Sequence, residues 1–220
     1  MTPRWIGGGL WVEHAGDAIL IDAPTGAAAE LGEDLGRLRA VVLTTGRARS
    51  LAGLLELLSA AERFRGGAPL ELHLPLGEER GAAVAEVWAH HWDAYPLVID
   101  AQQPGSTFSV GPFDVSTAAV QVGDPRFHPE RVEARLGLGL RISTGAGGPI
   151  AVLLGAAPDP GLHRLCAGAE LAVIEVGVAP WPRVDRAWRL RTEQALAVGA
   201  GARQVWLVGD DGQRLALPES

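Results

Sequence analysis

The stretch AVVLTTGRARSLAGLLELL, residues 40–58, joins an apolar run to a leucine-rich segment through a short polar turn. Residues 40–43 are apolar without alternation, which is typical of a strand buried on both faces. From Leu51 onward, leucine and alanine recur at helical spacing, so we expect an amphipathic helix whose N-terminus is capped by Ser50. The stretch therefore predicts a strand, a polar turn and a helix, as in a layered fold.

Apolar runs and turn residues predict the remaining elements. Residues 10–13 and 18–22 form a hairpin around a turn at residues 15–17. Further strands are expected at residues 70–74, 95–100, 107–110, 113–119, 135–143, 150–154, 171–176 and 204–208. Further helices are expected at residues 78–92 and 192–199. This order favours the α/β (α+β) class. We expect a four-layer αββα sandwich, two mixed β-sheets packed face to face with helices outside, as one domain over residues 1–220.

Composition and charge limit the classes of function. The chain has 220 residues, of which 47% are hydrophobic, enough for one domain with a substantial core. Its net charge of −7 makes nucleic acid an unexpected partner, because non-specific nucleic-acid binders are usually basic. The one cysteine, Cys166, excludes an internal disulfide and a cysteine-cluster metal site. No apolar run approaches the length of a membrane span, so we expect a cytoplasmic protein without a membrane partner.

The strand, polar turn and helix resemble the signature of the metallo-β-lactamase-fold hydrolases, which include the ribonuclease Z-like enzymes. In that family the turn has the pattern Thr-His-x-His-x-Asp-His, and a Gly-Leu pair follows in the helix. The present chain is aligned on Thr44, Gly53 and Leu54. The family's ligand positions then fall on Thr45, Arg47, Arg49 and Ser50. None of these is a usual zinc ligand, and arginine has no acceptor atom at all.

Later parts of the resemblance follow the same pattern, with scaffold residues kept and ligands replaced. Asp22 matches a family aspartate that braces the metal loop from behind. The glycine of the family's Ser-Gly-Asp-Thr motif is kept as Gly155, and Glu175 matches a glutamate that many relatives carry. The scaffold positions carried over by the resemblance are Asp22, Gly53, Gly155 and Glu175. The replaced ligand positions outside the turn are Ala156, a position near Arg189, and the end of the last strand, beside Asp210.

This combination implies a degenerate, metal-free member of the family with no catalytic residue and no cofactor, because all ligands of the metal constellation are replaced together. We expect a non-catalytic binding or partner subunit. Two alternatives stay open. One is a metal-free enzyme that uses Arg47, Arg49, Ser50 or Asp210, and the other is a metallo-hydrolase whose ligands the alignment misses.

The arginines at the former ligand positions allow two interpretations. If Arg47 and Arg49 converge with Arg189 and with the hydroxyls of Thr45 and Ser50, they form an anion-binding pocket, because guanidinium groups bind phosphate and carboxylate in bidentate fashion. Alternatively, the arginines fill the vacated space by pairing with nearby carboxylates. The candidates for such pairing are Asp22, Asp159, Glu175 and Asp210.

Histidines could in principle supply a replacement metal site. His90, His91 and Asp93 lie at the end of a predicted helix, but adjacent helical residues point about 100° apart and do not readily share one ion. The scattered histidines are His14, His73, His128 and His163. We therefore expect satisfied or surface histidines and no metal.

The segment 180–191 combines tryptophan and arginine, which are enriched at interface hot spots. It is consistent with a partner surface, with a lid, or with tryptophans that pack a loop onto the core. As a partner surface it would serve a homodimer or a complex with an active relative. The residues expected to carry that contact are Trp181, Arg183, Arg186 and Trp188.

Overall fold

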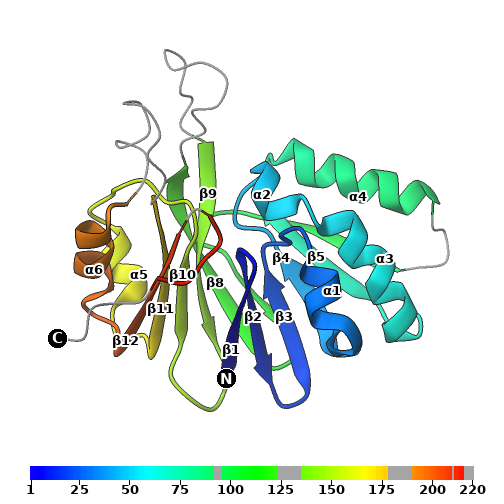
Figure 1. The fold of residues 1–220 in the computed structure, drawn as a ribbon, viewed down its shortest axis with the longest axis horizontal. Coiled ribbons are helices and arrows are strands. Elements are labelled where there is room, and N and C mark those ends of the chain that lie inside the picture. Colours follow the sequence, from blue (N-terminus) through cyan, green and yellow to red (C-terminus); the bar gives the residue numbers. More distant parts are fainter. Residues whose placement is uncertain (92–95, 123–134, 178–189, 210, 216–220) are drawn as a thin grey trace. The chain divides into compact units, whose positions relative to one another are not determined.

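The computed structural model describes residues 1–91, 96–122, 135–177, 190–209 and 211–215, which form two compact units. The first unit contains residues 1–103 together with residues 109–113. The second contains residues 104–108 and the chain from residue 114 onward. Each unit is built around a six-stranded mixed sheet (Figure 1).

The first sheet has its strands in chain order, β1 to β6. The strands are β1 (Thr2–Ile6), β2 (Gly9–His14), β3 (Asp17–Ile21), β4 (Leu38–Val42), β5 (Leu70–Pro75) and β6 (Leu97–Gln102). The β1–β2 and β2–β3 pairs are antiparallel, and every later pair is parallel. Parallel pairs need long crossover connections, and helices supply them here.

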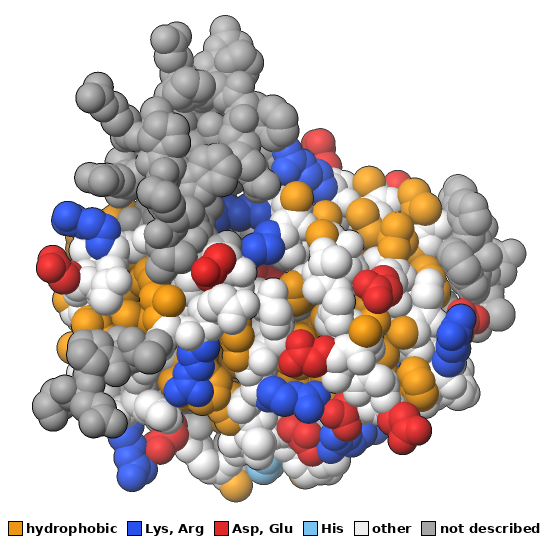
Figure 2. Space-filling view, viewed as in Figure 1, with side chains coloured by type: hydrophobic (Ala, Val, Ile, Leu, Met, Phe, Trp, Pro, Cys, Tyr) orange, Lys and Arg blue, Asp and Glu red, His pale blue; other side chains and the backbone are white. Residues whose placement is uncertain are grey.

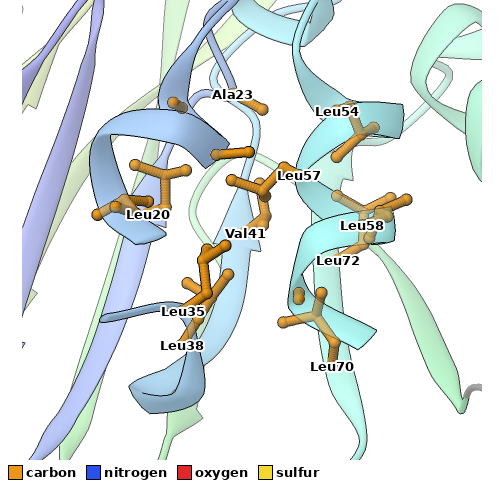
Figure 3. Packing of buried hydrophobic residues seen from close by; sticks show 14 of the residues in the cluster. Leu20, Ala23, Leu35, Leu38, Val41, Leu54, Leu57, Leu58, Leu70 and Leu72 are labelled. Atoms are coloured by element: carbon orange, nitrogen blue, oxygen red, sulfur yellow. The ribbon is translucent and has the colours of Figure 1, made fainter. Parts of the chain in front are cut away.

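The helices of the first unit are α1 (Ala27–Leu31), a 3₁₀ helix (Gly32–Arg37), α2 (Ala48–Leu51), α3 (Leu54–Arg65) and α4 (Glu79–His91). Their apolar faces cover one face of the sheet. Figure 3 shows Leu54, Leu57 and Leu58 of α3 against Val41 of β4 and Leu72 of β5. All of these side chains are fully buried. Burying a leucine side chain contributes about 1.5–3 kcal/mol, so α3 is held mainly by this contact.

The second sheet has the order β12-β11-β10-β9-β8-β7. Its strands are β7 (Thr107–Val110), β8 (Phe113–Val122), β9 (Arg135–Ser143), β10 (Ile150–Leu153), β11 (Leu171–Val176) and β12 (Gln204–Gly209). The pairs β8–β9 and β9–β10 are antiparallel, whereas β10–β11 and β11–β12 are parallel. The helices α5 (Leu162–Cys166) and α6 (Thr192–Gly199) lie side by side in Figure 1. They pack on the sheet through Cys166, Ala195 and their apolar neighbours.

The predicted fold class is confirmed as α/β with two mixed sheets and their helices. The bounds of β9, β11 and α6 are those expected from the sequence. The first strand, β1, was not predicted, because its segment combines proline and arginine with few apolar residues. The prediction of one domain over residues 1–220 stays a prediction.

The helix predicted to follow the polar turn is two helices, α2 and α3, separated at Ala52 and Gly53. The predicted cap at Ser50 is wrong. Ser50 lies inside α2, whose N-terminal flanking residue is Arg47 without a side-chain capping bond. The Ser50 hydroxyl has another partner, described below. In the described part of the chain, no helix is long and apolar enough to cross a membrane.

Candidate functional site

Asp22 follows β3 and has an unusual backbone conformation. Its φ is 58°, a left-handed conformation that few residues other than glycine adopt, although aspartate tolerates it better than most. The Asp22 backbone N–H donates to the Val42 carbonyl at the end of β4, with an N···O distance of 2.9 Å. The backbone is thus fixed where the chain leaves the sheet, and the carboxylate is directed at the loop after β4.

The Asp22 carboxylate joins the two ends of the loop that runs from Thr44 to Ser50. One oxygen accepts the Thr44 backbone N–H at 2.7 Å. The other accepts the Thr44 hydroxyl and the Ser50 hydroxyl, each at 2.9 Å. Since the Asp22 side chain is only 1% exposed, these bonds replace the water that burial removes. This is the arrangement that a residue bracing the loop requires.

Burial raises the pKa of the Asp22 carboxyl from its ordinary value to about 6. The hydrogen bonds from Thr44 and Ser50 and the positive charge of Arg49 act in the opposite direction and limit the rise. Near neutral pH the carboxyl is therefore mostly ionised, as an acceptor of three donors should be.

The hydroxyls of Thr45 and Ser50 belong to one hydrogen-bond chain. Ser50 Oγ lies 3.1 Å from Thr45 Oγ1 and donates its proton to Asp22, so Thr45 must be the donor between the two hydroxyls. Thr45 Oγ1 in turn accepts the Arg47 backbone N–H at 3.3 Å. Each donor in this chain points the same way, from the Arg47 N–H through the Thr45 and Ser50 hydroxyls to the Asp22 carboxylate. These hydrogen bonds hold the loop together.

Arg47 and Arg49 differ in exposure. Arg47 is 8% exposed, whereas Arg49, in α2, is half-buried and acts on Asp22 through its charge. Figure 2 shows basic side chains gathered on the surface over α2. The sequence analysis put both arginines in the polar turn. In the structure Arg47 is buried and directly precedes α2, whereas Arg49 lies inside that helix.

Two residues that the sequence analysis missed also contact the loop. The carboxyl group of Glu78 lies against the Gly46 backbone, where a Cβ atom would meet it at 1.7 Å. The Arg80 guanidinium donates to the Gly46 carbonyl at 3.4 Å, and the Arg80 backbone N–H donates to Glu78 at 3.0 Å. Glu78 precedes α4, which is a common place for an acidic residue. No local sequence signal relates that position to Gly46.

Gly53 is required by close packing. A Cβ atom at this position would lie 2.1 Å from the Pro24 carbonyl oxygen. The Gly53 backbone N–H donates to the Ala23 carbonyl at 2.9 Å, and the Ala23 N–H donates to the Ser50 carbonyl at 2.6 Å. These bonds hold α2 and the start of α3 against the segment that follows Asp22.

The remaining predicted positions belong to the second unit. Gly155 has a φ of 71°, which glycine adopts without strain. Ala156 is buried and forms a bridge with Val122, and Glu175 is buried on β11. Arg189 and Asp210 lie outside the described residues, as do the proposed partner residues Trp181, Arg183, Arg186 and Trp188.

None of the described histidines is a member of the loop's hydrogen-bond chain, which consists of Asp22, Thr45, Arg47 and Ser50. His73 is buried, with its Nε2 3.0 Å from Glu71 and its Nδ1 3.0 Å from the Gln102 amide nitrogen. His163 contacts the Pro160 carbonyl. Within the described ranges, no group of three or more His, Cys, Asp or Glu side chains could hold a metal ion. His128, Asp93 and the side chains of His90 and His91 fall outside those ranges.

A cavity of about 390 Å³ lies within the second unit, beside α5. It is lined by apolar residues such as Val120 and Leu165, with Arg141 among its few charged groups. The Arg141 guanidinium donates to the Leu165 and Ala167 carbonyls at 2.8 and 3.0 Å, and thereby caps the end of α5. Asp159, a candidate partner of the arginines in the sequence analysis, lines this cavity, whereas none of the former ligand positions among the described residues does.

No protein-family model matches the sequence, and no curated protein matches it. Solved structures are similar to the whole fold. The metallo-β-lactamase fold protein YhfI from Bacillus subtilis matches with a TM-score of 0.70 and 16% identity, covering 90% of this chain and 76% of its own. The short form of human tRNase Z also has a TM-score of 0.70, with 15% identity and coverage of 96% and 92%.

Zn²⁺-bound PqqB from Methylobacterium extorquens has a TM-score of 0.66 and 19% identity, with coverage of 90% and 76%. The chain therefore has the metallo-β-lactamase fold, as the sequence resemblance predicted.

The residues at the four former ligand positions of the turn decide whether this loop could hold a metal ion. The four ligand positions of the turn carry two hydroxyls that are already joined in a hydrogen-bond chain and two guanidinium groups. Zinc and iron sites in proteins are built from imidazole, thiolate and carboxylate groups. A permanent positive charge at two positions would repel a cation. The residues of this turn do not fit the family's metal centre.

Proposed function

We propose that the chain is a metal-free, non-catalytic protein of the metallo-β-lactamase fold that acts by binding a partner. The observation that carries this proposal is the hydrogen-bond chain from the Arg47 N–H through Thr45 and Ser50 to Asp22. This hydrogen-bond chain engages the hydroxyls of the former ligand positions and leaves no donor set for a metal-bound water. The Asp22 carboxylate that accepts from Ser50 is buried and also accepts from Thr44, so in this proposal it holds the loop together and does not act as a general base. A cytoplasmic location is part of the proposal, and cell fractionation tests it.

Metal analysis of the purified protein is the first test. After growth with added zinc, iron and manganese, we expect less than about 0.1 equivalent of any metal, because the ligand set of the turn is absent. The matched variant carries Thr45→His, Arg47→His, Arg49→Asp and Ser50→His, and is expected to gain zinc. Stoichiometric metal in the unmodified protein would contradict the proposal. It would mean that the protein is a metallo-hydrolase whose ligands lie outside the turn.

Activity provides an independent readout. Because a tRNase Z and a diphosphatase are among the similar structures, hydrolysis of phosphodiester and diphosphate bonds is the reaction to assay, with and without a chelator. We expect no hydrolysis above the uncatalysed rate. Turnover that survives the chelator would favour the metal-free enzyme, with Ser50 as the first residue to replace.

Anion binding at the same loop is the second candidate, and one observation favours it. Arg80 brings a third guanidinium group to the loop that carries Arg47 and Arg49, through its bond to the Gly46 carbonyl. Several guanidinium groups around one backbone segment form a phosphate-binding arrangement. The Glu78 carboxylate against Gly46 offsets part of that charge.

Thermal unfolding in inorganic phosphate tests this candidate. If the loop binds phosphate with a dissociation constant well below the added concentration, the midpoint should rise by roughly 5 °C relative to chloride of equal ionic strength. Arg49→Gln should abolish the rise, whereas Arg203→Gln should not, because Arg203 pairs with Glu170 on the surface. An equal response of both variants would assign the effect to general salt stabilisation.

A further inference from the structure

Each of the two sheets has two edge strands, and edges that expose unpaired backbone groups invite pairing with another chain. Three of the four edges carry a feature that discourages this. On β1, Pro3 lacks an N–H and Arg4 adds a charge. The strand β7 has four residues. Along β12 the chain returns, so that the Leu215 N–H donates to the Leu207 carbonyl at 2.8 Å.

The fourth edge, β6, has none of these features. Its sequence is LVIDAQ, without proline, lysine or arginine. Val98 and Ile99 are 51% and 42% exposed, which is unusual for β-branched apolar residues in a strand. The single charge, Asp100, accepts a hydrogen bond from the Gln102 amide at 2.6 Å. No described strand pairs with β6 on the side away from β5.

The hydrogen bonds to β5 show which backbone groups of β6 face the open edge. The Leu70 N–H donates to the Pro96 carbonyl at 3.0 Å, and the Leu76 N–H donates to the Gln102 carbonyl at 2.9 Å. Backbone groups of alternate residues in a strand point to opposite sides. The even-numbered residues therefore face β5, and the N–H and C=O groups of Leu97, Ile99 and Ala101 face outward.

We propose that β6 is a homodimer interface in which two copies of this strand pair antiparallel, with Ile99 opposite the partner's Ile99 on a two-fold axis. In this register Leu97 lies opposite the partner's Ala101, and every outward N–H and C=O group of these residues finds its counterpart. Side chains that lie opposite each other also share a face of the continued sheet.

The sequence of β6 favours pairing with a second copy of the same strand, and it favours the register centred on Ile99 over the registers shifted by one residue. A shift that placed Asp100 on the axis would set two carboxylates directly opposite each other, which is destabilising. A shift to Val98 would place Ala101 opposite residue 95, before the start of β6, so fewer outward groups would find a counterpart. Centring on Ile99 places the two Ile99 side chains together at the axis and sets Val98 opposite the partner's Asp100, so the two carboxylates stay apart. The helix α4 packs beside β6. This inference does not depend on the loss of the metal site.

The oligomeric state in solution tests the interface. Sedimentation at about 100 μM should give a dimer, since edge pairing with apolar contacts supports micromolar dissociation constants. Ile99→Pro should give a monomer that unfolds like the dilute unmodified protein, because the lost N–H points away from β5. Ile99→Thr keeps the N–H and the strand propensity, so it should retain part of the dimer.

Cross-linking tests the register. In a hydrogen-bonded antiparallel pair the Cα atoms lie about 5.5 Å apart, which is within the range of a disulfide. Oxidised Ile99→Cys should therefore form a covalent dimer. Leu55→Cys, at an exposed site on α3, should not, and the only native cysteine, Cys166, is buried. A monomeric unmodified protein at this concentration, or a dimer that persists in Ile99→Pro, would overturn the proposal.

Discussion

Replacing Gly53 with alanine is expected to lower the free energy of unfolding by about 3 kcal/mol, at the upper end of what an overpacked site loses. The added Cβ would lie 2.1 Å from the Pro24 oxygen, 2.7 Å from the Pro24 carbonyl carbon and 3.2 Å from the Ala23 oxygen. All three are backbone atoms, so no side-chain rotation relieves the clash. The φ of Gly53 is −93°, which alanine adopts freely, and the loss is therefore steric.

Urea unfolding followed by tryptophan fluorescence measures this loss, and the seven tryptophans of the chain provide the signal. The matched control is Gly145→Ala, because a Cβ at Gly145 meets nothing within 4 Å. That variant should stay within about 0.5 kcal/mol of the unmodified protein. If Gly53→Ala behaved like Gly145→Ala, the close approach of the helix start to residues 23–24 would be contradicted.

The Gly53 contact also explains why the helix after the turn was only partly predictable. The leucine spacing from Leu51 onward indicates one helix, and propensity gives no reason to interrupt it. The interruption arises because Gly53 packs on Pro24, a residue 29 positions earlier in the chain. Such a contact has no local signature. The same holds for Glu78 against Gly46, which only the folded chain brings together.

Other features were predictable because their cause is local. The apolar runs of β9 and β11 and the helical pattern of α6 have the expected bounds, since each is limited by glycine, proline or polar residues. The position of Asp22 behind the loop came from a motif of a few residues after a strand. The Ser50 cap failed because the hydroxyl binds Asp22, a distant acceptor, and not the helix backbone.

Asp22→Asn is expected to remove a pH dependence of stability that the unmodified protein shows between about pH 4 and pH 6. The Asp22 pKa is about 6 in the folded chain, against an ordinary value of 3.8. Between these values the folded state binds the proton more tightly than the unfolded state, so the free energy of unfolding falls as pH rises. Two pKa units correspond to about 3 kcal/mol, an order-of-magnitude figure for a buried group.

Stability falls with rising pH because burial favours the neutral form of the Asp22 carboxyl group. Below pH 4 the carboxyl is neutral in both states, and its contribution is fully present. As pH rises through the folded pKa, the buried side chain ionises, and the contribution is lost. Asparagine does not titrate, and its carbonyl still accepts from Thr44 or Ser50. From pH 4 to pH 6.5, the free energy of unfolding of the unmodified protein should therefore fall steadily relative to that of Asp22→Asn.

Ser50→Ala changes the same titration in the opposite direction. The Ser50 hydroxyl donates to Asp22 at 2.9 Å and lowers its pKa, so its removal should raise the pKa further and extend the fall in stability to higher pH. Urea unfolding of the three proteins at half-unit pH steps measures both slopes, and the comparison cancels groups they share. If Ser50→Ala and Asp22→Asn both kept the slope of the unmodified protein, its origin would lie outside this loop. A flat profile for Asp22→Asn beside a steeper one for Ser50→Ala would assign the titration to the carboxylate that closes the loop.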